Sequence, residues 1–596
     1  MGTNVYSVTV TVADAGGLTD SVGIEATVSD VVESTTSPGG VTSGLIHWLR
    51  ADSGTFSDTA GTNAASAGAE VAYWQNRAQD DLHVTTPAGY TNADLVAGSE
   101  TSNFNLALDF ERNQNDHLRY TGVVLPASTD GTVLAVGSKE ATMAGGWATI
   151  FGFGSAANKP TLDVDDGADF NGLTPGDSAY QSGRNASLMY TNPWSDGSSP
   201  VQFHHGAIAV NEMAIMGINW QHGVTEGMAS IFNGENVPGS TTGMEITAPT
   251  YPEPNYYIGS DGGGEKWDGL ITEQMVYSRQ LTAAELQRVQ SYLAIRYGIT
   301  LDDDRVSDAI AQYDYVDSTG AVIWPGLTTN QAYHNDVAGI GRDDASDLEQ
   351  QKSKSINSGS VVAIDNGGAF AADMSYLVWG NNGQAAGYGV SYSPTSFTPV
   401  AGYYHMSRIW KVAETGTVGT VTVLNDTADH LLVDDDGDFT NGGTTEYAMS
   451  GGSVTVDFSH GQFFTFGAER TAPGGIAAGL SHWVRADVGV YSDAGSTLAT
   501  DGQSVQQWND QSGAGLDLGQ ATTTQQPIYV APSARNNFNP ALDFTDDFMF
   551  NDGRLVQTTD GLTMIAVGDT DVTGGVRTLY ASGDNMNDPT MDLDGT

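Results

Sequence analysis

The chain has 596 residues, 39% of them hydrophobic, which is enough material for several packed domains. Its 22 basic and 72 acidic residues give a formal net charge of −50, and this excludes nucleic acid or an anionic membrane as the main partner. Cysteine is absent, so disulfides, thiolate catalysis and cysteine-ligated zinc are excluded as well.

Two alternating apolar runs, residues 6–12 and 22–28, predict a β-hairpin near the amino terminus. Two strands are only marginally stable alone. We therefore interpret residues 1–33 as the closing hairpin of an upstream cadherin-like or immunoglobulin-like module. A flexible linker is expected over residues 34–43, which contain a Pro-Gly-Gly run.

Residues 44–300 contain short β-type runs separated by Gly, Asn and Asp turns, the pattern of an antiparallel sandwich. One helix interrupts this pattern. Thr282 and Glu285 predict its start through a capping box, and Gly298 predicts its end. An apolar stripe would pack it onto the sandwich as a short capping helix, formed by Leu286, Val289 and Leu293.

A smaller β-sandwich is expected over residues 301–469. Its strand-like runs cover residues 361–364, 376–379, 408–412, 420–424, 453–458 and 463–466. A second Pro-Gly-Gly run lies in residues 470–478, so this segment predicts another linker.

An internal repeat follows that linker. Residues 44–52 (GLIHWLRAD) return as residues 479–487 (GLSHWVRAD). Further matches pair residues 103–110 with 537–544, and residues 135–137 with 566–568. The second copy, residues 479–596, lacks the later part of the first. We interpret it as a truncated sandwich and the chain as a segment of a longer multidomain protein.

The runs at 47–52, 107–110 and 268–298 resemble laminin-G-like domains of large bacterial surface proteins. Residues 301–469 resemble an uncharacterised β domain that accompanies them. The resemblance implies an all-β chain of tandem β-sandwiches: a concanavalin A-like jelly roll, a smaller immunoglobulin-like β-sandwich and a partial second jelly roll. It does not specify a function, because such folds include lectins, glycosidases, lyases and inert spacers.

Two acidic clusters beside glycine turns predict Ca²⁺ sites, because Ca²⁺ prefers several oxygen ligands. The alternative for each cluster is a solvated turn. The candidate ligands are Asp163, Asp165 and Asp169 in the first cluster and Asp434, Asp436 and Asp438 in the second. The resemblance implies a further cation site on carboxylates such as Asp109 and Asp268, with Asp109 as a partner of Arg50 or as a turn carboxylate as the alternative.

Aromatic residues near Pro and Gly loops are candidates for stacking on a sugar, with core packing as the alternative. They are Trp194, Tyr251, Tyr256, Tyr257 and Trp267. A laminarinase-type Glu-x-Asp-x-x-Glu strand is absent. Asp109 and Glu111 are the nearest pair, and Thr545 replaces Glu111 in the second copy, so no catalytic residue is assigned.

These features predict a segment of a large secreted or cell-surface, adhesin-like protein that binds glycans or other surface ligands through Ca²⁺-supported β-sandwiches. No nucleic-acid partner and no membrane insertion are expected, because no apolar run approaches the ~18 residues that a bilayer requires. Two alternatives stay open. One is a polysaccharide-degrading enzyme of jelly-roll fold, a glycoside hydrolase or lyase. The other is a purely structural spacer or filament subunit.

Overall fold

In the computed structural model the chain forms two compact units. The first comprises Met1–Ser360, Ile364–Trp379 and Ala413–Gly419, and the second comprises Val361–Ala363, Gly380–Val412 and Thr420–Thr596. The structure describes residues 4–594 except 14–18, 29–35, 79–81, 123, 126–128, 141–146, 154–160, 166–187, 192–200, 205–209, 223, 225–227, 239–254, 261, 263–265, 303–310, 398–401, 471, 477–478, 533–536, 538, 552–562, 570–575 and 582–589.

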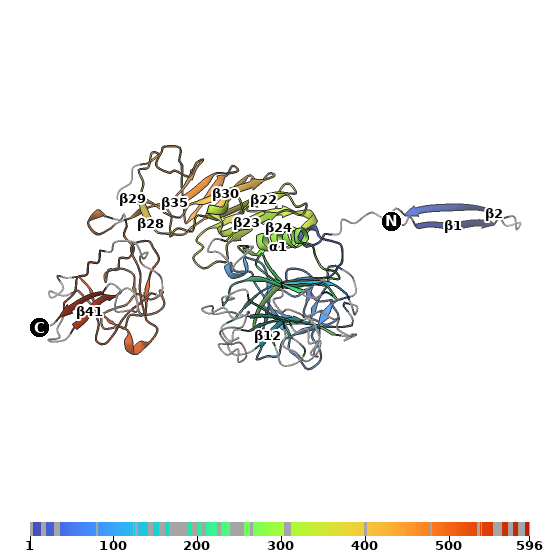
Figure 1. The fold of residues 1–596 in the computed structure, drawn as a ribbon, viewed down its shortest axis with the longest axis horizontal. Coiled ribbons are helices and arrows are strands. Elements are labelled where there is room, and N and C mark those ends of the chain that lie inside the picture. Colours follow the sequence, from blue (N-terminus) through green and yellow to red (C-terminus); the bar gives the residue numbers. More distant parts are fainter. Residues whose placement is uncertain are drawn as a thin grey trace. The chain divides into compact units, whose positions relative to one another are not determined.

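The chain is nearly all β, which confirms the predicted fold class. The amino-terminal hairpin is present as β1 (Asn4–Ala13) and β2 (Thr19–Val28), which pair antiparallel with Asn4 opposite Val28 (Figure 1). Short 3₁₀ turns connect several strands of the chain, at Pro38–Gly40, Glu100–Ser102, Gln331–Tyr333, Asp344–Ser346, Pro473–Gly475 and Thr523–Gln525.

Residues 44–300, the first sandwich, form two nine-stranded antiparallel sheets. One sheet has the order β15 (Val201–His204), β14 (Leu188–Thr191), β13 (Thr161–Asp165), β12 (Trp147–Gly152), β19 (Asn255–Ile258), β10 (Leu118–Thr121), β7 (Val84–Thr85), β6 (Tyr73–Trp74) and β4 (Thr55–Phe56). The other has the order β18 (Glu235–Pro238), β17 (Met228–Phe232), β16 (Ala214–Trp220), β11 (Gly131–Lys139), β20 (Gly269–Tyr277), β9 (Ala107–Phe110), β8 (Ala93–Val96) and β5 (Glu70–Val71), with β3 (Leu45–Arg50) also paired to β20.

The sheet that contains β11 is buried on both faces. Val133 and Ala135 of β11 belong to the core between the two sheets. Leu134 and Val136, which point to the opposite face because side chains alternate along a strand, belong to a second core. Every residue of β11 is buried as a result, which explains why residues 133–137 of this strand are a continuous apolar run rather than an alternating one.

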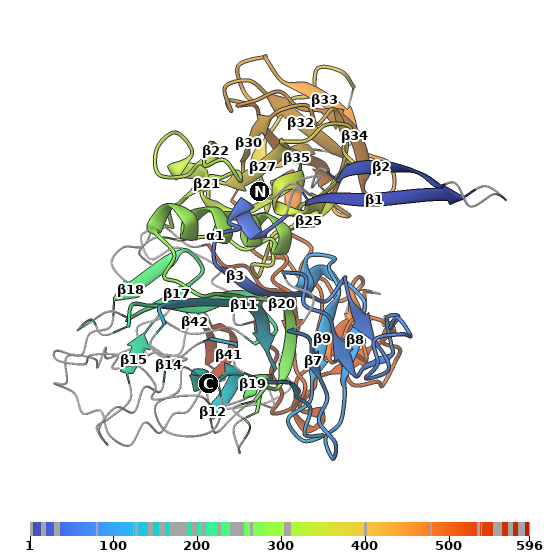
Figure 2. The same cartoon turned by 90° about the vertical axis from the view of Figure 1, so that its right-hand side faces the viewer.

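The second core lies under α1 (Ala283–Tyr297), which confirms the predicted capping helix. Thr282 and Glu285 form the expected capping box, and Gly298 ends the helix with a φ of 65°. Figure 2 shows α1 lying along the face of β3 and β11. Its apolar stripe is fully buried in this core, namely Leu286, Val289 and Leu293.

A carboxylate is buried under the helix. Glu273 lies at the middle of β20, on the strand face that α1 covers, and has no exposed surface. Its oxygens accept hydrogen bonds from Trp48 Nε1 at 2.6 Å, Tyr292 Oη at 2.9 Å and Tyr297 Oη at 2.9 Å. The guanidinium of Arg296 lies 3.6 Å away. A buried charge is tolerated when it is paired and hydrogen-bonded in this way.

An ion network continues from this carboxylate toward residues 331–356. Asp52 binds Arg50 Nε at 2.9 Å and Arg296 Nη2 at 2.6 Å. Burial alone would raise the pKa of Asp52, but Arg296 and Arg50 hold it below its usual value. Arg50 also binds Asp347 at 2.8 Å, and Arg77 binds the same carboxylate. The first sandwich, α1 and the following β segment are therefore joined by charge as well as by apolar packing.

Asn103 supplies a second connection between the same parts. It is fully buried with a φ of 48°, and its Nδ2 donates to Arg296 O and Ser353 Oγ, each at 3.0 Å. Its Oδ1 accepts from Lys354 N at 2.8 Å. The strands of this part of the first unit are β21 (Asp314–Val316), β22 (Val322–Pro325), β23 (Asn335–Asp343), β24 (Leu348–Gln350) and β25 (Lys352–Lys354).

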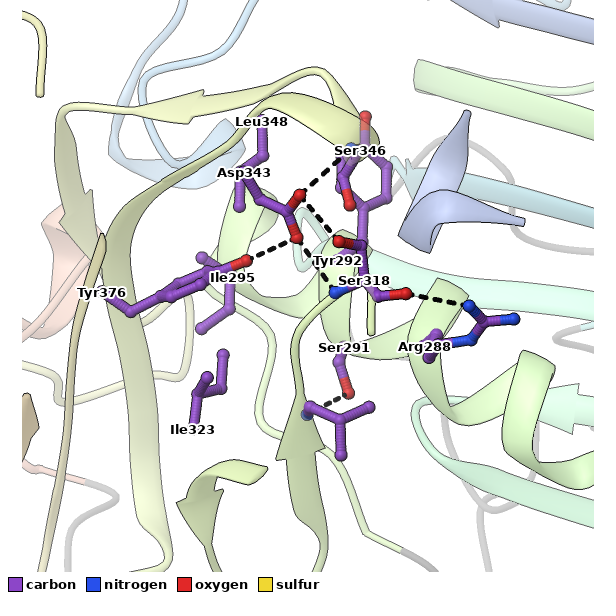
Figure 3. A pocket seen from close by; sticks show the side chains of 11 residues that line it. Arg288, Ser291, Tyr292, Ile295, Ser318, Ile323, Asp343, Ser346, Leu348 and Tyr376 are labelled. Atoms are coloured by element: carbon purple, nitrogen blue, oxygen red, sulfur yellow. Dashed lines mark hydrogen bonds between the residues drawn. The ribbon is translucent and has the colours of Figure 1, made fainter. Parts of the chain in front are cut away.

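A small internal space lies where α1 meets these strands (Figure 3). Its volume of about 10 Å³ is room for one water molecule. Asp343 faces it and accepts from Ser318 N at 2.9 Å, Ser318 Oγ at 2.9 Å and Tyr376 Oη at 2.7 Å. Burial, followed by the charge of Asp343, raises the pKa of Tyr376. The space is a satisfied junction between elements rather than a ligand cleft.

The remaining strands of the predicted middle domain are β26 (Ala363–Asp365), β27 (Ser375–Asn381), β28 (Tyr388–Ser391), β29 (Gly402–Met406), β30 (Trp410–Thr415), β31 (Thr420–Leu424), β32 (His430–Asp434), β33 (Thr445–Ala448), β34 (Ser453–Asp457) and β35 (Phe463–Arg470). In the second unit β35 pairs with β29 and β32, and β31 pairs with β34. Trp410 stacks on Phe464, with ring centroids 5.4 Å apart.

The second repeat has seven strands among the described residues. They are β36 (Val490–Tyr491), β37 (Gln507–Trp508), β38 (Leu518–Gly519), β39 (Ile528–Val530), β40 (Ala541–Asp543), β41 (Val576–Ala581) and β42 (Thr590–Asp594). They pair antiparallel as β36-β37-β38, β39-β40 and β41-β42.

Candidate functional site

Carboxylates from four sequence-distant segments gather at one end of the β20 sheet. Asp94 on β8 and Asp109 on β9 are direct cross-strand partners. The N–H of Glu140, just after β11, donates to the carbonyl oxygen of Asp268, just before β20, at 3.0 Å. We call this group the acidic edge, defined as Asp94, Asp109, Glu111, Asp116, Glu140 and Asp268.

The acidic edge concentrates negative charge. Burial and, after it, the neighbouring charges of Glu140, Glu111 and Asp94 together raise the pKa of Asp109 to about 6. Burial and the same kind of repulsion also raise the pKa of Glu111. Carboxylates opposite one another destabilise a sheet, so this edge favours whatever neutralises it, a proton or a cation.

Backbone donors hold two of these carboxylates in place. Asp116 accepts from Glu111 N at 2.9 Å and from Thr91 Oγ1 at 2.5 Å. Asp268 is buried and accepts from Arg112 N at 3.0 Å. Asp109 differs from both, because its Oδ1 is buried without a hydrogen-bond partner. This oxygen is the group at the edge that an added cation or proton would satisfy.

The alternative role for Asp109, as the partner of Arg50, is wrong. Arg50 instead binds Asp52 and Asp347. The corresponding arginine of the second repeat, Arg485, binds Asp487 in the same way. The reason is local, because an arginine and an aspartate two residues apart on either side of a turn meet directly, whereas Asp109 lies on a different strand.

No group of three or more His, Asp or Glu side chains among the described residues converges closely enough to hold a metal ion by itself. A Ca²⁺ ion at the acidic edge would therefore complete its coordination with backbone carbonyls or water, as Ca²⁺ sites commonly do. The unsatisfied oxygen of Asp109 is the observation that fits such an ion.

Three aromatic rings line up beside this region. His117 follows Asp116, and its ring contacts Tyr90 with centroids 3.9 Å apart and Tyr257 with centroids 5.8 Å apart. Burial lowers the pKa of His117 to about 4, and the positive charges of Arg119 and Lys266 act in the same direction. Tyr90 is 39% exposed, so it presents an aromatic face to solvent next to carboxylates.

Of the aromatic residues selected from sequence and described by the structure, Tyr257 alone contacts this group of rings. Tyr256 and Trp267 are fully buried in the core between the sheets, so they present no face to a ligand. Tyr257 is mostly buried on β19 and contacts His117. Trp194 and Tyr251 lie outside the described residues. Tyr90 was not selected from sequence. Its place in a Gly-Tyr-Thr turn near several acidic residues is the sequence feature that could have identified it as a candidate ligand-binding residue.

The calcium ligands selected from sequence have two different settings. Asp163 and Asp165 lie on β13, and Asp169 is outside the described residues. The second cluster forms a turn in which carboxylates accept backbone N–H groups. Asp434 Oδ1 accepts from Asp436 N at 2.9 Å, and Asp436 Oδ1 accepts from Asp438 N at 2.8 Å. Like the acidic edge, this turn contains no group of three carboxylates that could hold a metal ion by themselves. Its assignment as a Ca²⁺ site stays a prediction.

Comparison with known proteins adds little on activity. A domain of unknown function (DUF8202) matches residues 285–462. No curated protein matches the chain. No helix among the described residues is long and apolar enough to cross a membrane.

Several solved structures are similar to part of the chain. Domain 4 of AbnA, an extracellular GH43 arabinanase from Geobacillus stearothermophilus seen with arabinotriose, is 14% identical, with a TM-score of 0.25 over 42% of this chain and 97% of that one. A Trypanosoma rangeli sialidase with the inhibitor DANA is 12% identical, with a TM-score of 0.24 over 42% of this chain and 33% of that one. A GH54 α-L-arabinofuranosidase is 11% identical, with a TM-score of 0.27 over 43% of this chain and 60% of that one. The matching part of this chain thus spans about a third of the sialidase.

Proposed function

We propose that the first sandwich is a laminin-G-like, carbohydrate-binding module of a secreted or cell-surface, adhesin-like protein, with its ligand bound at the acidic edge beside Tyr90. The observations that carry this proposal are the exposed face of Tyr90 and, in the neighbouring acidic edge, the buried Oδ1 of Asp109, which has no hydrogen-bond partner. Sugars are bound by aromatic faces combined with a few polar groups. The net charge of −50 also suits a neutral glycan or a cation better than an anionic ligand.

Ca²⁺ has a specific place in this proposal. Bound between Asp109 and Asp268, it would neutralise the acidic edge and supply a positive centre to which sugar hydroxyls coordinate. We expect 5 mM Ca²⁺ to raise the melting temperature of the chain at pH 7.5, and Asp109→Asn to abolish that rise. The matched control is Asp543→Asn, the exposed counterpart in the second repeat, which should keep it. An equal rise in all three proteins would place the ion elsewhere.

Glycan binding has a separate test. The chain is applied to an array of neutral and acidic glycans with Ca²⁺, and any hit is titrated with Tyr90→Ala and Tyr90→Phe. We expect Tyr90→Ala to weaken binding at least tenfold, which is about 1.4 kcal/mol, while Tyr90→Phe retains it because the stacking face is kept. An array without hits, or equal loss for both variants, contradicts the proposed site.

The pKa of Asp109 predicts a pH dependence. The folded-state pKa of about 6 lies above the usual 3.8, so the fold favours the protonated form of Asp109. The stability that this side chain contributes is fully present below about pH 4 and is lost as pH rises through 6. Asp109→Asn removes the repulsion between Asp109 and its neighbouring carboxylates. At pH 8 the free energy of unfolding of the variant should therefore be about 1 kcal/mol higher than that of the parent, after allowance for solvent screening. At pH 4 we expect no difference. Denaturant titrations at both pH values without Ca²⁺ measure this, and equal gains at both would contradict it.

A polysaccharide-degrading enzyme is the second candidate. The raised pKa values of Asp109 and Glu111 are the observation in its favour, because a general acid must hold its proton near neutral pH. Incubation with a panel of polysaccharides, followed by reducing-end and unsaturated-uronate assays, distinguishes the two. If the chain releases oligosaccharide and Asp109→Asn abolishes that release, the enzyme proposal replaces the binding proposal.

A further inference from the structure

Three neighbouring strands of the second unit place a glycine between two histidines. Gly467 of β35 lies opposite His405 of β29 and also opposite His430 of β32, so β35 runs between the other two strands. Directly paired residues of antiparallel strands have their side chains on the same face of the sheet. The two imidazoles therefore leave one face of the sheet from either side of a position that has no side chain.

The hydroxyl of Tyr403 occupies the space over that glycine. Tyr403 lies two residues before His405 on β29, so its side chain leaves the same face. A Cβ added at Gly467 would lie 2.7 Å from Tyr403 Oη, which puts this oxygen in the row between the two histidines. The ring centroids of Tyr403 and His430 are 5.6 Å apart. A side chain at position 467 would displace the hydroxyl, so glycine is required there.

Three polar atoms of this row are buried without a hydrogen-bond partner, namely Tyr403 Oη, His405 Nε2 and His430 Nδ1. Tyr403 is only 3% exposed and His405 only 4%. Folded proteins rarely leave buried polar atoms unpaired, and an ion or a water molecule is a common reason when they do. A single bound species over Gly467 would satisfy all three atoms.

His405 is oriented as a metal ligand is. Its Nδ1 lies 2.8 Å from Met406 O. Because a carbonyl oxygen only accepts, Nδ1 carries the ring hydrogen, and burial lowers the pKa of His405 so that the ring stays neutral near pH 7. Nε2 is therefore left with a free lone pair. Donation of the other ring N–H to a backbone carbonyl is the usual arrangement around a histidine that binds a metal.

His430 is held by stacking and lies in a field of negative charge. Phe397 stacks on its ring, with centroids 4.0 Å apart and an interplanar angle of 4°, which fixes the orientation of the imidazole. Burial lowers the pKa of His430, whereas the negative charges of Asp429, Glu446 and Glu469 act against that shift. These charges attract a cation to the row. His430 is only half-buried, so an ion can reach it from solvent.

We propose that Tyr403, His405 and His430 form a binding site for one divalent transition-metal ion. His405 Nε2, His430 Nδ1 and the oxygen of Tyr403 are the protein ligands, and water completes the coordination. Imidazole nitrogens suit Cu²⁺, Zn²⁺ and Ni²⁺, whereas Ca²⁺ and Mg²⁺ prefer oxygen ligands alone. Binding releases the hydroxyl proton of Tyr403 to solvent, because the ligand is the phenolate. The site lies in the second unit and does not depend on glycan binding by the first sandwich.

The test titrates the chelator-treated full chain with Cu²⁺, which binds nitrogen and oxygen ligands most tightly among these ions. Excess Mg²⁺ is present to occupy surface carboxylates. We expect tight binding of one Cu²⁺ per chain, a visible phenolate-to-copper charge-transfer band, and hyperfine splitting from two imidazole nitrogens in the electron paramagnetic resonance spectrum. Tyr403→Phe keeps the ring and should remove the band, and His430→Gln should weaken binding at least tenfold.

His460→Gln is the matched control, because His460 is an exposed histidine of the same unit. It should bind Cu²⁺ as the parent does, and thermal unfolding without metal checks that each variant is folded. Binding that neither Tyr403→Phe nor His430→Gln changes overturns the site. Absence of the band and of the two-nitrogen splitting in the parent overturns it as well, even if a variant fails to fold, and the three atoms then enclose a water molecule only.

Discussion

Replacing Glu273 with leucine is expected to lower the free energy of unfolding of the first unit by about 3–5 kcal/mol. The carboxylate is fully buried and accepts from Trp48, Tyr292 and Tyr297. Leucine fills much of the volume but leaves three buried donors unsatisfied and removes the counter-charge beside Arg296. Hydrogen exchange of peptides from β3, β20 and α1 along a urea titration measures the loss.

Glu273→Gln separates hydrogen bonding from charge. Its amide oxygen can accept from Trp48 and Tyr292, while its NH₂ donates to the Tyr297 hydroxyl, so only the attraction to Arg296 is lost. We expect a smaller loss of about 1–2 kcal/mol. If the glutamine and leucine variants lose the same amount, the charge of Glu273 rather than its hydrogen bonds holds this junction. If neither loses stability, the network contributes nothing.

The sequence predicted elements whose signals are local. The capping box of Thr282 and Glu285, the glycine at 298 and the apolar stripe between them lie within 17 residues, and the helix has the predicted ends. The runs at 420–424 and 453–458 became β31 and β34 for the same reason. Helix caps and strand alternation depend on neighbours that the sequence itself places side by side.

The candidate site could not be predicted in the same way. Asp94, Asp109, Glu140 and Asp268 are far apart in the chain and meet only because of the strand order β11-β20-β9-β8. Sequence spacing favoured the compact cluster at Asp434 instead, where short acidic spacing also suits a turn in which carboxylates cap backbone N–H groups. Local spacing identifies residues that are close, not residues whose oxygens point to one place.

Burial of aromatic residues was equally hard to read. Trp267 precedes β20 in a Gly-rich stretch that resembles a surface loop, yet it is fully buried between the sheets. Glu273 is the reverse case, a charged residue within a largely apolar strand. When such a strand is covered on both faces, the charged residue is buried and needs a buried partner of opposite charge or a hydrogen-bond donor. Of the residues that bind Glu273, Trp48 recurs in the second copy as Trp483.

Asn103→Ala is expected to destabilise the first unit by about 3–4 kcal/mol, of which about 1 kcal/mol comes from placing alanine at a φ of 48°. The rest comes from Ser353 Oγ and Lys354 N, which lose the hydrogen bond to Asn103. Arg296 O loses one of two hydrogen bonds and keeps the one from Asn105 Nδ2. Thermal and urea unfolding, with hydrogen exchange at β25 as the local readout, measure the change.

Asn537→Ala is the matched control for this prediction. Asn537 has nearly the same φ, 52°, but is exposed. The backbone strain is therefore common to both variants, and the difference between them isolates the hydrogen bonds of Asn103. We expect Asn537→Ala to cost about 1 kcal/mol within the second repeat. Equal losses would mean that strain alone explains both, and that residues 353–354 are held to the first sandwich by the ion network of Arg50 and Asp347 instead.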